Sequence, residues 1–160
     1  DIMLFSDSGK AARFYEGDVR PMGRSARGVR GMRLDKAESA MALVVINENM
    51  RSHSVLTATE NGFGKRTNVD EFTRHGRGAR GMIAIQTSQR NGKVVAARLV
   101  STNDEIMLIT TGGVLIRTRV KEIREMGRST QGVKLINLGE DELLSGLEKV
   151  LDNEESDSSE

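Results

Sequence analysis

The chain lacks cysteine altogether and contains very few aromatic residues. Its 160 residues include no cysteine and no tryptophan, and only 3% of them are aromatic. Without cysteine there is no disulfide, no thiolate metal ligand and no cysteine nucleophile, which fits a reducing compartment. With so few rings, we do not expect bases to stack on aromatic side chains in any complex with nucleic acid.

Long apolar runs and a leader segment are missing as well. No run approaches the roughly 20 residues that span a bilayer, and the N-terminus has no signal-peptide pattern. We therefore expect a cytoplasmic protein without a membrane partner. The chain begins inside an apolar, strand-like run, Ile2 to Phe5, which indicates that it was cut from a longer polypeptide.

Catalytic and metal-binding motifs are also missing. His53 and His75 are the only histidines, and neither has partners at metal-ligand spacing. There is no nucleophile elbow, Walker loop or His-Glu-x-x-His motif. The segment Gly76 to Gly81 resembles a glycine-rich phosphate loop only superficially, because no Lys-Ser/Thr pair follows it. We predict no catalytic residue, no metal site and no cofactor in this chain.

Acidic residues are concentrated at the C-terminal end. The whole chain has 24 basic and 23 acidic residues, but five of the acids lie in residues 151–160, which contain no base. Residues 1–150 therefore carry 24 bases against 18 acids, a net charge of +6. We predict an acidic, disordered tail over 151–160 because this segment has too little apolar content to fold. Such a tail either competes with nucleic acid for the basic body or is simply a solvated end.

Three copies of one pattern follow each other along the chain. Residues 23–28, 76–81 and 127–132, which we name the Gly-Arg turns, align with one another, and their last glycines are 53 and 51 residues apart. We name these glycines, Gly28, Gly81 and Gly132, the anchors. Upstream the alignment continues in constant register, with Gly9, Gly62 and Gly113 each 19 residues before the anchor. We predict three repeat units, residues 1–49, 50–104 and 105–150.

Each unit contains the pattern of a β-hairpin. In the third unit, Ile106 to Thr111 and Val114 to Val120 are β-rich runs on either side of Gly112-Gly113. Repeats of about 50 residues with several strands each are typical of propeller-like folds. We predict an all-β fold of three propeller-like blades. Residues 140–151 also fit an amphipathic helix, but the repeat register favours a strand, which we predict.

Basic side chains recur in every unit and form the candidate functional site. Glycines in the turns permit φ > 0 and expose backbone N–H groups, while the planar donor fork of arginine suits phosphate oxygens. If the units lie side by side, the turns form a basic stripe that matches the regular charge of a duplex. The alternative is that they are solvated connections. The candidate DNA-binding residues are Lys10, Arg13, Arg20, Arg24, Arg27, Arg30, Lys65, Arg66, Arg74, Arg77, Arg80, Arg117, Arg119, Lys121, Arg124, Arg128 and Lys134.

Three of these arginines have a second interpretation. One arginine lies 15 residues before each anchor, and an acidic residue follows it after five positions. The pairs are Arg13 with Asp18, Arg66 with Glu71 and Arg117 with Glu122. They are compatible both with phosphate contacts and with ion pairs inside each unit, and the sequence leaves both open.

These motifs resemble the C-terminal domain of bacterial DNA gyrase A. The resemblance covers residues 1–150. It is carried by Ile2 to Ser6 with Gly9-Lys10, Val19 to Arg24, Gly28 to Gly31, Leu56 to Thr59, Gly64 to Thr67, Arg117 to Val120 and Gly127 to Val133. It implies a β-pinwheel, a propeller-like disc of six blades that exchange strands with their neighbours. The three blades here would be the C-terminal half of that disc.

The resemblance also implies a function and partners. In this family double-stranded DNA wraps around the basic rim, which lets the enzyme supercoil DNA in the bacterial cytoplasm, at the nucleoid. The partners implied are the rest of gyrase A, which holds the strand-breaking tyrosine, and gyrase B, which hydrolyses ATP. ATP and magnesium would act elsewhere in the parent enzyme, a type II topoisomerase, and not in this non-catalytic fragment.

The match to the family is incomplete at one motif. The family's box Gln-Arg-Arg-Gly-Gly-Arg-Gly is only partly matched, by residues 75–81, so we expect the box itself upstream. Three blades without it should bind DNA but bend it less than six. Two alternatives are the equivalent domain of topoisomerase IV and a propeller-like module whose basic rim binds an acidic protein.

Overall fold

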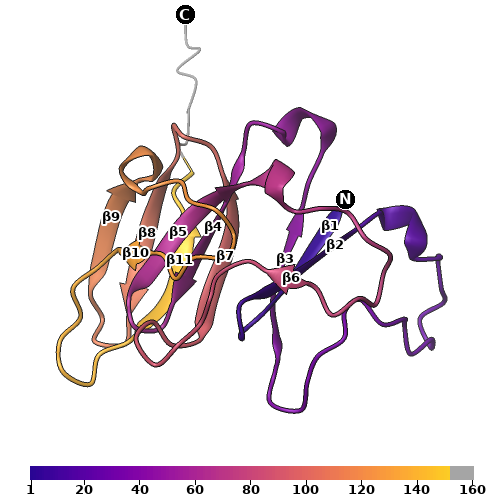
Figure 1. The fold of residues 1–160 in the computed structure, drawn as a ribbon, viewed down its shortest axis with the longest axis horizontal. Helices are drawn as coiled ribbons and strands as arrows, with labels where there is room; N and C mark the ends of the chain where they lie inside the picture. The colour runs from indigo at the N-terminus through magenta and orange to yellow at the C-terminus, as the bar shows by residue number, and fades with distance from the viewer. Residues whose placement is uncertain (152–160) are drawn as a thin grey trace, which may run out of the picture.

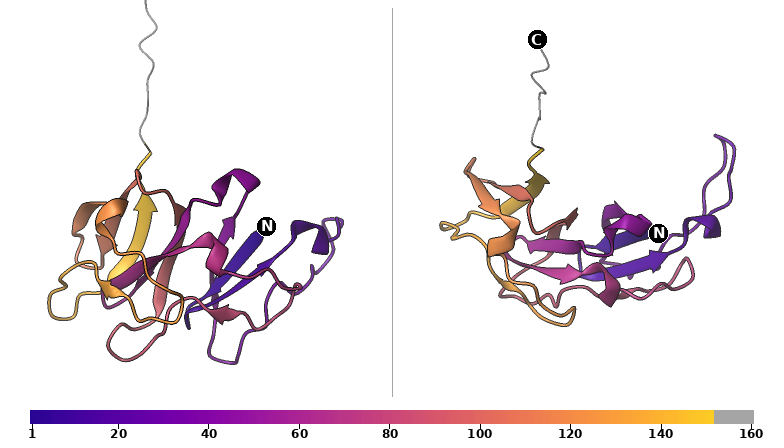
Figure 2. Two further views of the ribbon diagram at one scale, coloured as in Figure 1. Left: turned by 45° about the horizontal axis from the view of Figure 1, so that its top comes forward. Right: turned by 90° about the horizontal axis from the view of Figure 1, so that it is seen from above.

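Three antiparallel sheets, one for each repeat unit, stand side by side in an arc (Figures 1 and 2). The computed structural model describes residues 1–151. We name the sheets blades 1 to 3. Blade 1 contains β1 (Ile2–Ser6), β2 (Lys10–Phe14) and β3 (Ala40–Val45); blade 2 contains β4 (Ser54–Thr59), β5 (Phe63–Asn68) and β7 (Val94–Val100); blade 3 contains β8 (Glu105–Thr110), β9 (Leu115–Arg119) and β11 (Leu144–Lys149). The predicted all-β class is confirmed.

The remaining elements are short. In the part of the chain that the structure describes, the helical segments are single 3-10 turns, η1 (Glu16–Asp18), η2 (Glu48–Met50), η3 (Val69–Glu71) and η4 (Val120–Glu122). None of them is long or apolar enough to cross a membrane. Two further strands, β6 (Met82–Ile83) and β10 (Val133–Lys134), directly follow the second and third anchors.

Strands are exchanged between neighbouring blades. The sheet orders are β3-β1-β2-β6 in blade 1, β10-β5-β4-β7 in blade 2 and β11-β8-β9 in blade 3. Thus β6, which belongs to the second repeat unit, pairs with β2 of the first, with Lys10 opposite Ile83. In the same register β10 of the third unit pairs with β5, with Phe63 opposite Lys134. Each unit therefore completes the blade of the unit before it.

The core lies between the blades, because alternate residues of each strand point to opposite faces. Met3 and Phe5 of blade 1 pack with Val55 and Phe72 of unit 2, and the rings of Phe5 and Phe72 meet edge to face. The opposite face of β4 packs in the same way against β8 and β11 of blade 3. Two apolar cores thus hold three blades together.

The ambiguous C-terminal segment is a strand. β11 pairs antiparallel with β8, with Leu147 opposite Leu108, and both leucines are buried in the core between blades 2 and 3. The predicted strand over residues 140–151 is therefore confirmed for Leu144–Lys149. The prediction of a disordered tail falls on residues 152–160, which lie outside the described part of the chain, apart from Leu151.

Candidate nucleic-acid interface

The second and third Gly-Arg turns are each hydrogen-bonded to the repeat unit before them, and we call the series of three turns the row. The backbone N–H of Gly78 in the second turn donates to the carbonyl of Gly31 at 2.8 Å, and the carbonyl of Ala79 accepts from Arg33 at 2.8 Å. In the third turn the carbonyl of Thr130 accepts from the N–H of Gln86 at 2.9 Å. Neighbouring repeat units are therefore joined through the second and third turns.

The first arginine of the second and third turns links neighbouring units. Arg77 donates to the carbonyl of Arg30 at 2.7 Å, and Arg128 donates to the carbonyl of Ile83 at 3.0 Å. Arg30 and Ile83 occupy the same place in the repeat, two residues after the anchor. Arg24, at the same position of the first turn, is exposed and makes no side-chain hydrogen bond among residues 1–151. Arg77 and Arg128 thus have a structural role besides their charge.

Lys65 is not on the surface. Its side chain is fully buried, and its ammonium donates to the carbonyls of Gly127 and Arg128 and to the hydroxyl of Thr130. Burial lowers the pKa of Lys65 to about 8, because the charged form is poorly solvated there. In this conformation Lys65 cannot contact phosphate, so we remove it from the predicted interface. Its role is to hold the third turn against blade 2.

Arg13 and Arg66 bind backbone carbonyls of the following blade. Arg13 donates to the carbonyls of Val69 and Phe72 at 3.1 and 3.0 Å, and Arg66 donates to the carbonyl of Ile123 at 2.6 Å. Neither of the predicted ion pairs, Arg13 with Asp18 and Arg66 with Glu71, is formed. Burial lowers the pKa of Arg13, although a guanidinium remains charged at any ordinary pH. Both arginines connect blades and are poorly placed for DNA.

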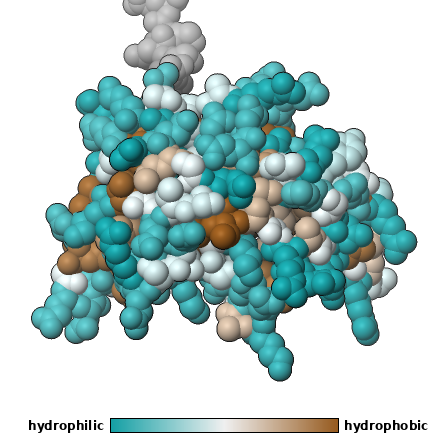
Figure 3. All heavy atoms as spheres, viewed as in Figure 1, coloured by the Kyte–Doolittle hydropathy of each residue, from teal (hydrophilic) through white to brown (hydrophobic). Residues whose placement is uncertain are grey.

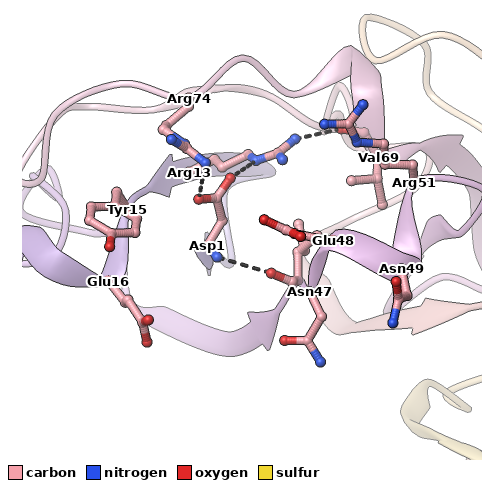
Figure 4. Close-up of a pocket in the computed structure, with 11 residues that line it drawn as sticks. Asp1, Arg13, Tyr15, Glu16, Asn47, Glu48, Asn49, Arg51, Val69 and Arg74 are labelled. Carbon is pink, nitrogen blue, oxygen red and sulfur yellow. Dashed lines mark hydrogen bonds and ion pairs between the residues drawn. The ribbon is translucent and has the colours of Figure 1, made fainter.

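Arg13 and Arg117 of this column each pair with an acid at the start of their own repeat unit. Asp1 accepts from Arg13 at 2.8 Å and also lies 2.7 Å from Arg74, as Figure 4 shows. Glu105 pairs with Arg117 and lies 3.9 Å from Arg119. Asp1 and Glu105 share one repeat position, 27 residues before the anchor, and this shared position was the sequence signal for the pairing.

Lys10 is also engaged in ion pairs. Its ammonium lies 2.7 Å from Glu38 and 3.4 Å from Asp35. Hydrogen bonds from the backbone of Asp35, from Lys10 and from Ser8 lower the pKa of Glu38 to about 2, so this carboxylate is charged at neutral pH. Hydrogen bonds to Glu38 in turn raise the pKa of Lys10. A phosphate would have to compete with this carboxylate for Lys10.

Eight of the predicted residues are exposed and make no side-chain hydrogen bond or ion pair within residues 1–151. They are Arg20, Arg24, Arg27, Arg30, Arg80, Lys121, Arg124 and Lys134. Exposed guanidinium and ammonium groups without a protein partner are available to phosphate oxygens at little desolvation cost. Arg27 and Arg80 occupy the same place in the first two turns, directly before the anchor. The first two turns therefore each present a free arginine at this position, which Gln131 occupies in the third turn.

The chain matches one protein family and several relatives. The family described as the DNA gyrase C-terminal domain, beta-propeller, matches residues 1–47, 53–101 and 104–150. DNA gyrase A of Pseudomonas aeruginosa is 51% identical over 150 residues, and that of Escherichia coli is 46% identical over 161 residues. These alignments cover 94% and 99% of this chain but only 16% and 18% of the relatives. The chain is thus similar to a small part of each relative.

Two solved structures share the arrangement of blades. A DNA gyrase A C-terminal domain superposes with a TM-score of 0.85 at 30% identity, covering 94% of this chain and 50% of that one. The C-terminal domain of a DNA topoisomerase IV superposes with a TM-score of 0.86 at 25% identity, covering 93% and 46%. Three blades therefore correspond to about half of either structure.

Proposed function

Because this chain belongs to the DNA gyrase C-terminal domain family, we propose that it binds duplex DNA through phosphate contacts along the row of Gly-Arg turns. The observation that carries the proposal is the set of exposed basic groups that make no side-chain hydrogen bond or ion pair within residues 1–151, among them Arg27 and Arg80 at the same position of two turns. Contacts to phosphate position a duplex without reading its sequence. We therefore expect binding to depend strongly on salt and weakly on sequence.

We further propose that this binding bends DNA within a larger type II topoisomerase. The chain would be a non-catalytic part of gyrase A, with gyrase B as the partner that uses ATP and magnesium, in the bacterial cytoplasm at the nucleoid. Bending a site of 20–30 bp by 40–90° costs on the order of 1–6 kcal/mol, so contacts on several blades must act together. A row that is fixed by hydrogen bonds between blades suits this task because its curvature is set before DNA binds.

Gyrase is favoured over topoisomerase IV by sequence rather than by shape. The two solved structures superpose equally well on this chain, but the gyrase domain is more similar in sequence, and the curated relatives at 51% and 46% identity are gyrase proteins. The interpretation as a module that binds an acidic protein predicts no affinity for plain duplex DNA, so a binding assay separates it from our proposal.

The test is fluorescence anisotropy of a mixed-sequence duplex of about 40 bp, titrated with protein at several salt concentrations. For the variant Arg27→Ala/Arg80→Ala we expect weaker binding and a salt slope shallower by about 1–2, because each phosphate contact contributes about 0.9 to the slope. The matched control is Lys36→Ala/Arg51→Ala, which removes two exposed basic residues outside the turns.

The control should keep a salt slope close to that of the unmodified protein. If the two double variants lose the same amount of slope, binding reflects total charge and the row has no special role. If the folded, unmodified protein does not bind at low salt, the proposal is wrong and a protein partner becomes the better explanation.

A further inference from the structure

The third Gly-Arg turn presents no free basic side chain of its own. Arg128 is the only basic residue in residues 127–132, and its guanidinium donates to the carbonyl of Ile83. At the position of Arg27 and Arg80 this turn has Gln131, which carries no charge. If the row binds phosphate at all three turns, the basic group at the third turn has to come from another segment.

The loop between β6 and β7 is fastened to this turn. Asn91 in the loop is fully buried, and its side-chain amide donates to the carbonyl of Gln131 at 3.2 Å and to that of Gln86 at 2.7 Å. The side-chain oxygen of Asn91 accepts from the backbone N–H of Ser88 at 2.7 Å. Because the donors and the acceptor of this buried amide are all used, the loop is held in one position beside the third turn.

Arg90, the residue before Asn91, is exposed and faces an aromatic ring. Its guanidinium carbon lies 4.7 Å from the centroid of the Phe63 ring, and the ammonium of Lys134 lies 6.0 Å from the same centroid. Phe63 begins β5 and is paired with Lys134 on β10, two residues after the third anchor. Two cations therefore gather at one ring beside the third turn.

The ring orders the arginine without neutralising it. An aromatic face attracts a cation but takes up none of its N–H donors in ordinary hydrogen bonds, so the guanidinium fork stays available. Within residues 1–151 neither Arg90 nor Lys134 makes a side-chain hydrogen bond or ion pair. The carboxylate of Glu60, which contacts this loop, accepts instead from the backbone N–H of Lys93 at 3.1 Å. A guanidinium that is already ordered loses less side-chain entropy when it binds a phosphate.

The loop lies on a hydrophilic edge of the molecule. In Figure 1 the segment between β6 and β7 forms part of the lower edge, and in Figure 3 hydrophilic side chains project from that edge. Counted from the anchors, the first unit has Ala37 in place of Arg90 and Lys10 in place of Phe63. The pair of Arg90 and Phe63 is thus present where the neighbouring turn lacks a free arginine.

We propose that Arg90, with Lys134 beside it, is the phosphate contact of the third turn and replaces there the arginine that the first two turns have before their anchors. This inference rests on the proposed function, because it names a further contact of the same DNA-binding row. Phe63 and Asn91 are positioning residues, since the ring holds the guanidinium and the amide holds the loop. The contact should not depend on base sequence, because phosphates are common to all sequences.

Fluorescence anisotropy with a mixed-sequence duplex of about 40 bp at several salt concentrations tests the contact. Arg90→Ala should weaken binding and make the salt slope shallower by about 0.9, the contribution of one phosphate contact. The matched control is Arg51→Ala, which removes one exposed arginine outside the row and should leave the slope nearly unchanged. An equal loss of slope in the two variants would show that Arg90 contributes only to the total charge.

The replacement of one arginine by another is tested by compensation. In the Arg90→Ala background, Gln131→Arg should restore the salt slope, because it places an arginine where the first two turns have theirs. Asn49→Arg in the same background restores the net charge at an exposed site outside the row and should not restore the slope. Equal recovery with both second substitutions would overturn the assignment to the third turn.

The geometry is tested by NMR without DNA. The δ-protons of Arg90 should be shifted upfield by the Phe63 ring, and Phe63→Leu should abolish this shift; its absence from the unmodified protein would overturn the role of the ring. If the unmodified protein binds duplex DNA while Arg90→Ala behaves like Arg51→Ala, this inference is wrong and the proposed function stands. If the folded, unmodified protein does not bind at low salt, the proposed function is wrong and the assignment of Arg90 is wrong with it.

Discussion

Arginine performs two different tasks in the Gly-Arg turns. Arg77 and Arg128 use the guanidinium fork to hold a backbone carbonyl of the preceding unit, whereas Arg27 and Arg80 remain exposed and free of protein partners within residues 1–151. A bound guanidinium loses side-chain entropy on folding, so it is already ordered when DNA arrives. A free one remains available for a phosphate. The second turn thus contains one structural and one free arginine within six residues.

Lys65 makes folding stability depend on pH. Its pKa of about 8 in the folded protein lies below the ordinary value of 10.5, so between these two pH values the unfolded chain binds more protons. The free energy of unfolding should therefore rise with pH above about 8, by at most about 1.4 kcal/mol per pH unit, and this term should be constant below it. We expect Lys65→Met to remove this rise, measured by urea denaturation at pH 7.5, 8.5 and 9.5 at fixed protein concentration.

Lys121→Met is the matched control for this measurement. Lys121 is exposed on the surface of η4, and its replacement should leave the rise with pH unchanged. If the unmodified protein shows no rise in stability between pH 7.5 and 9.5, Lys65 is not held in a site that disfavours its charge. The conclusion that Lys65 holds the third turn against blade 2 from a buried position would then be wrong.

At the scale of the elements, the close approach of a turn to the preceding strand decides which glycines are indispensable. Gly81 has φ of +84°, and a Cβ there would lie 2.7 Å from the carbonyl oxygen of Ala11. For Gly81→Ala we expect a loss of at least about 1–3 kcal/mol in the free energy of unfolding, from backbone strain alone. Urea denaturation at fixed protein concentration measures this loss.

Gly23→Ala is the comparison, since Gly23 begins the first turn, has no left-handed φ and would place its Cβ in open space. Its effect should stay within about 0.5 kcal/mol. Equal stability of the two variants would mean that the junction between blades 1 and 2 relaxes around an added methyl group. In that case strand exchange would tolerate a looser contact than the structure shows.

The repeat in the sequence predicts where the strands lie, but it does not predict which strands pair with one another. Hairpins around Gly9, Gly62 and Gly113 follow from local turn chemistry, and the strand at Leu144–Lys149 follows from repeat register. The pairing of β6 with β2 joins residues more than 70 positions apart, such as Lys10 and Ile83, and no local pattern specifies it. Burial of Lys65 was hidden for the same reason, because its acceptors belong to the next repeat unit. The sequence identifies the basic residues, but tertiary contacts determine which of their side chains make no hydrogen bond or ion pair within residues 1–151.

At the scale of the whole molecule, charge and curvature act together. Residues 1–150 carry a net charge of +6, and three of the free arginines, Arg24, Arg27 and Arg80, lie in the first two turns. A duplex that follows the row gains contacts in proportion to its bending, which offsets the elastic cost of the bend. On the proposed function, the acidic residues after position 151 would oppose this attraction, because they reduce the net charge of the chain to +1.

Deletion of residues 152–160 should therefore tighten DNA binding. At about 50 mM salt we expect roughly a tenfold lower dissociation constant, about 1.4 kcal/mol, with the difference shrinking as salt screens the charges. Anisotropy with the same duplex of about 40 bp measures it. A full-length variant with its five acids replaced by Asn or Gln should match the deletion, because the hypothesis assigns the effect to charge. If both variants bind no more tightly than the unmodified chain at low salt, the acidic residues do not compete with DNA. If only the deletion binds more tightly, the tail acts by occupying space rather than by its charge.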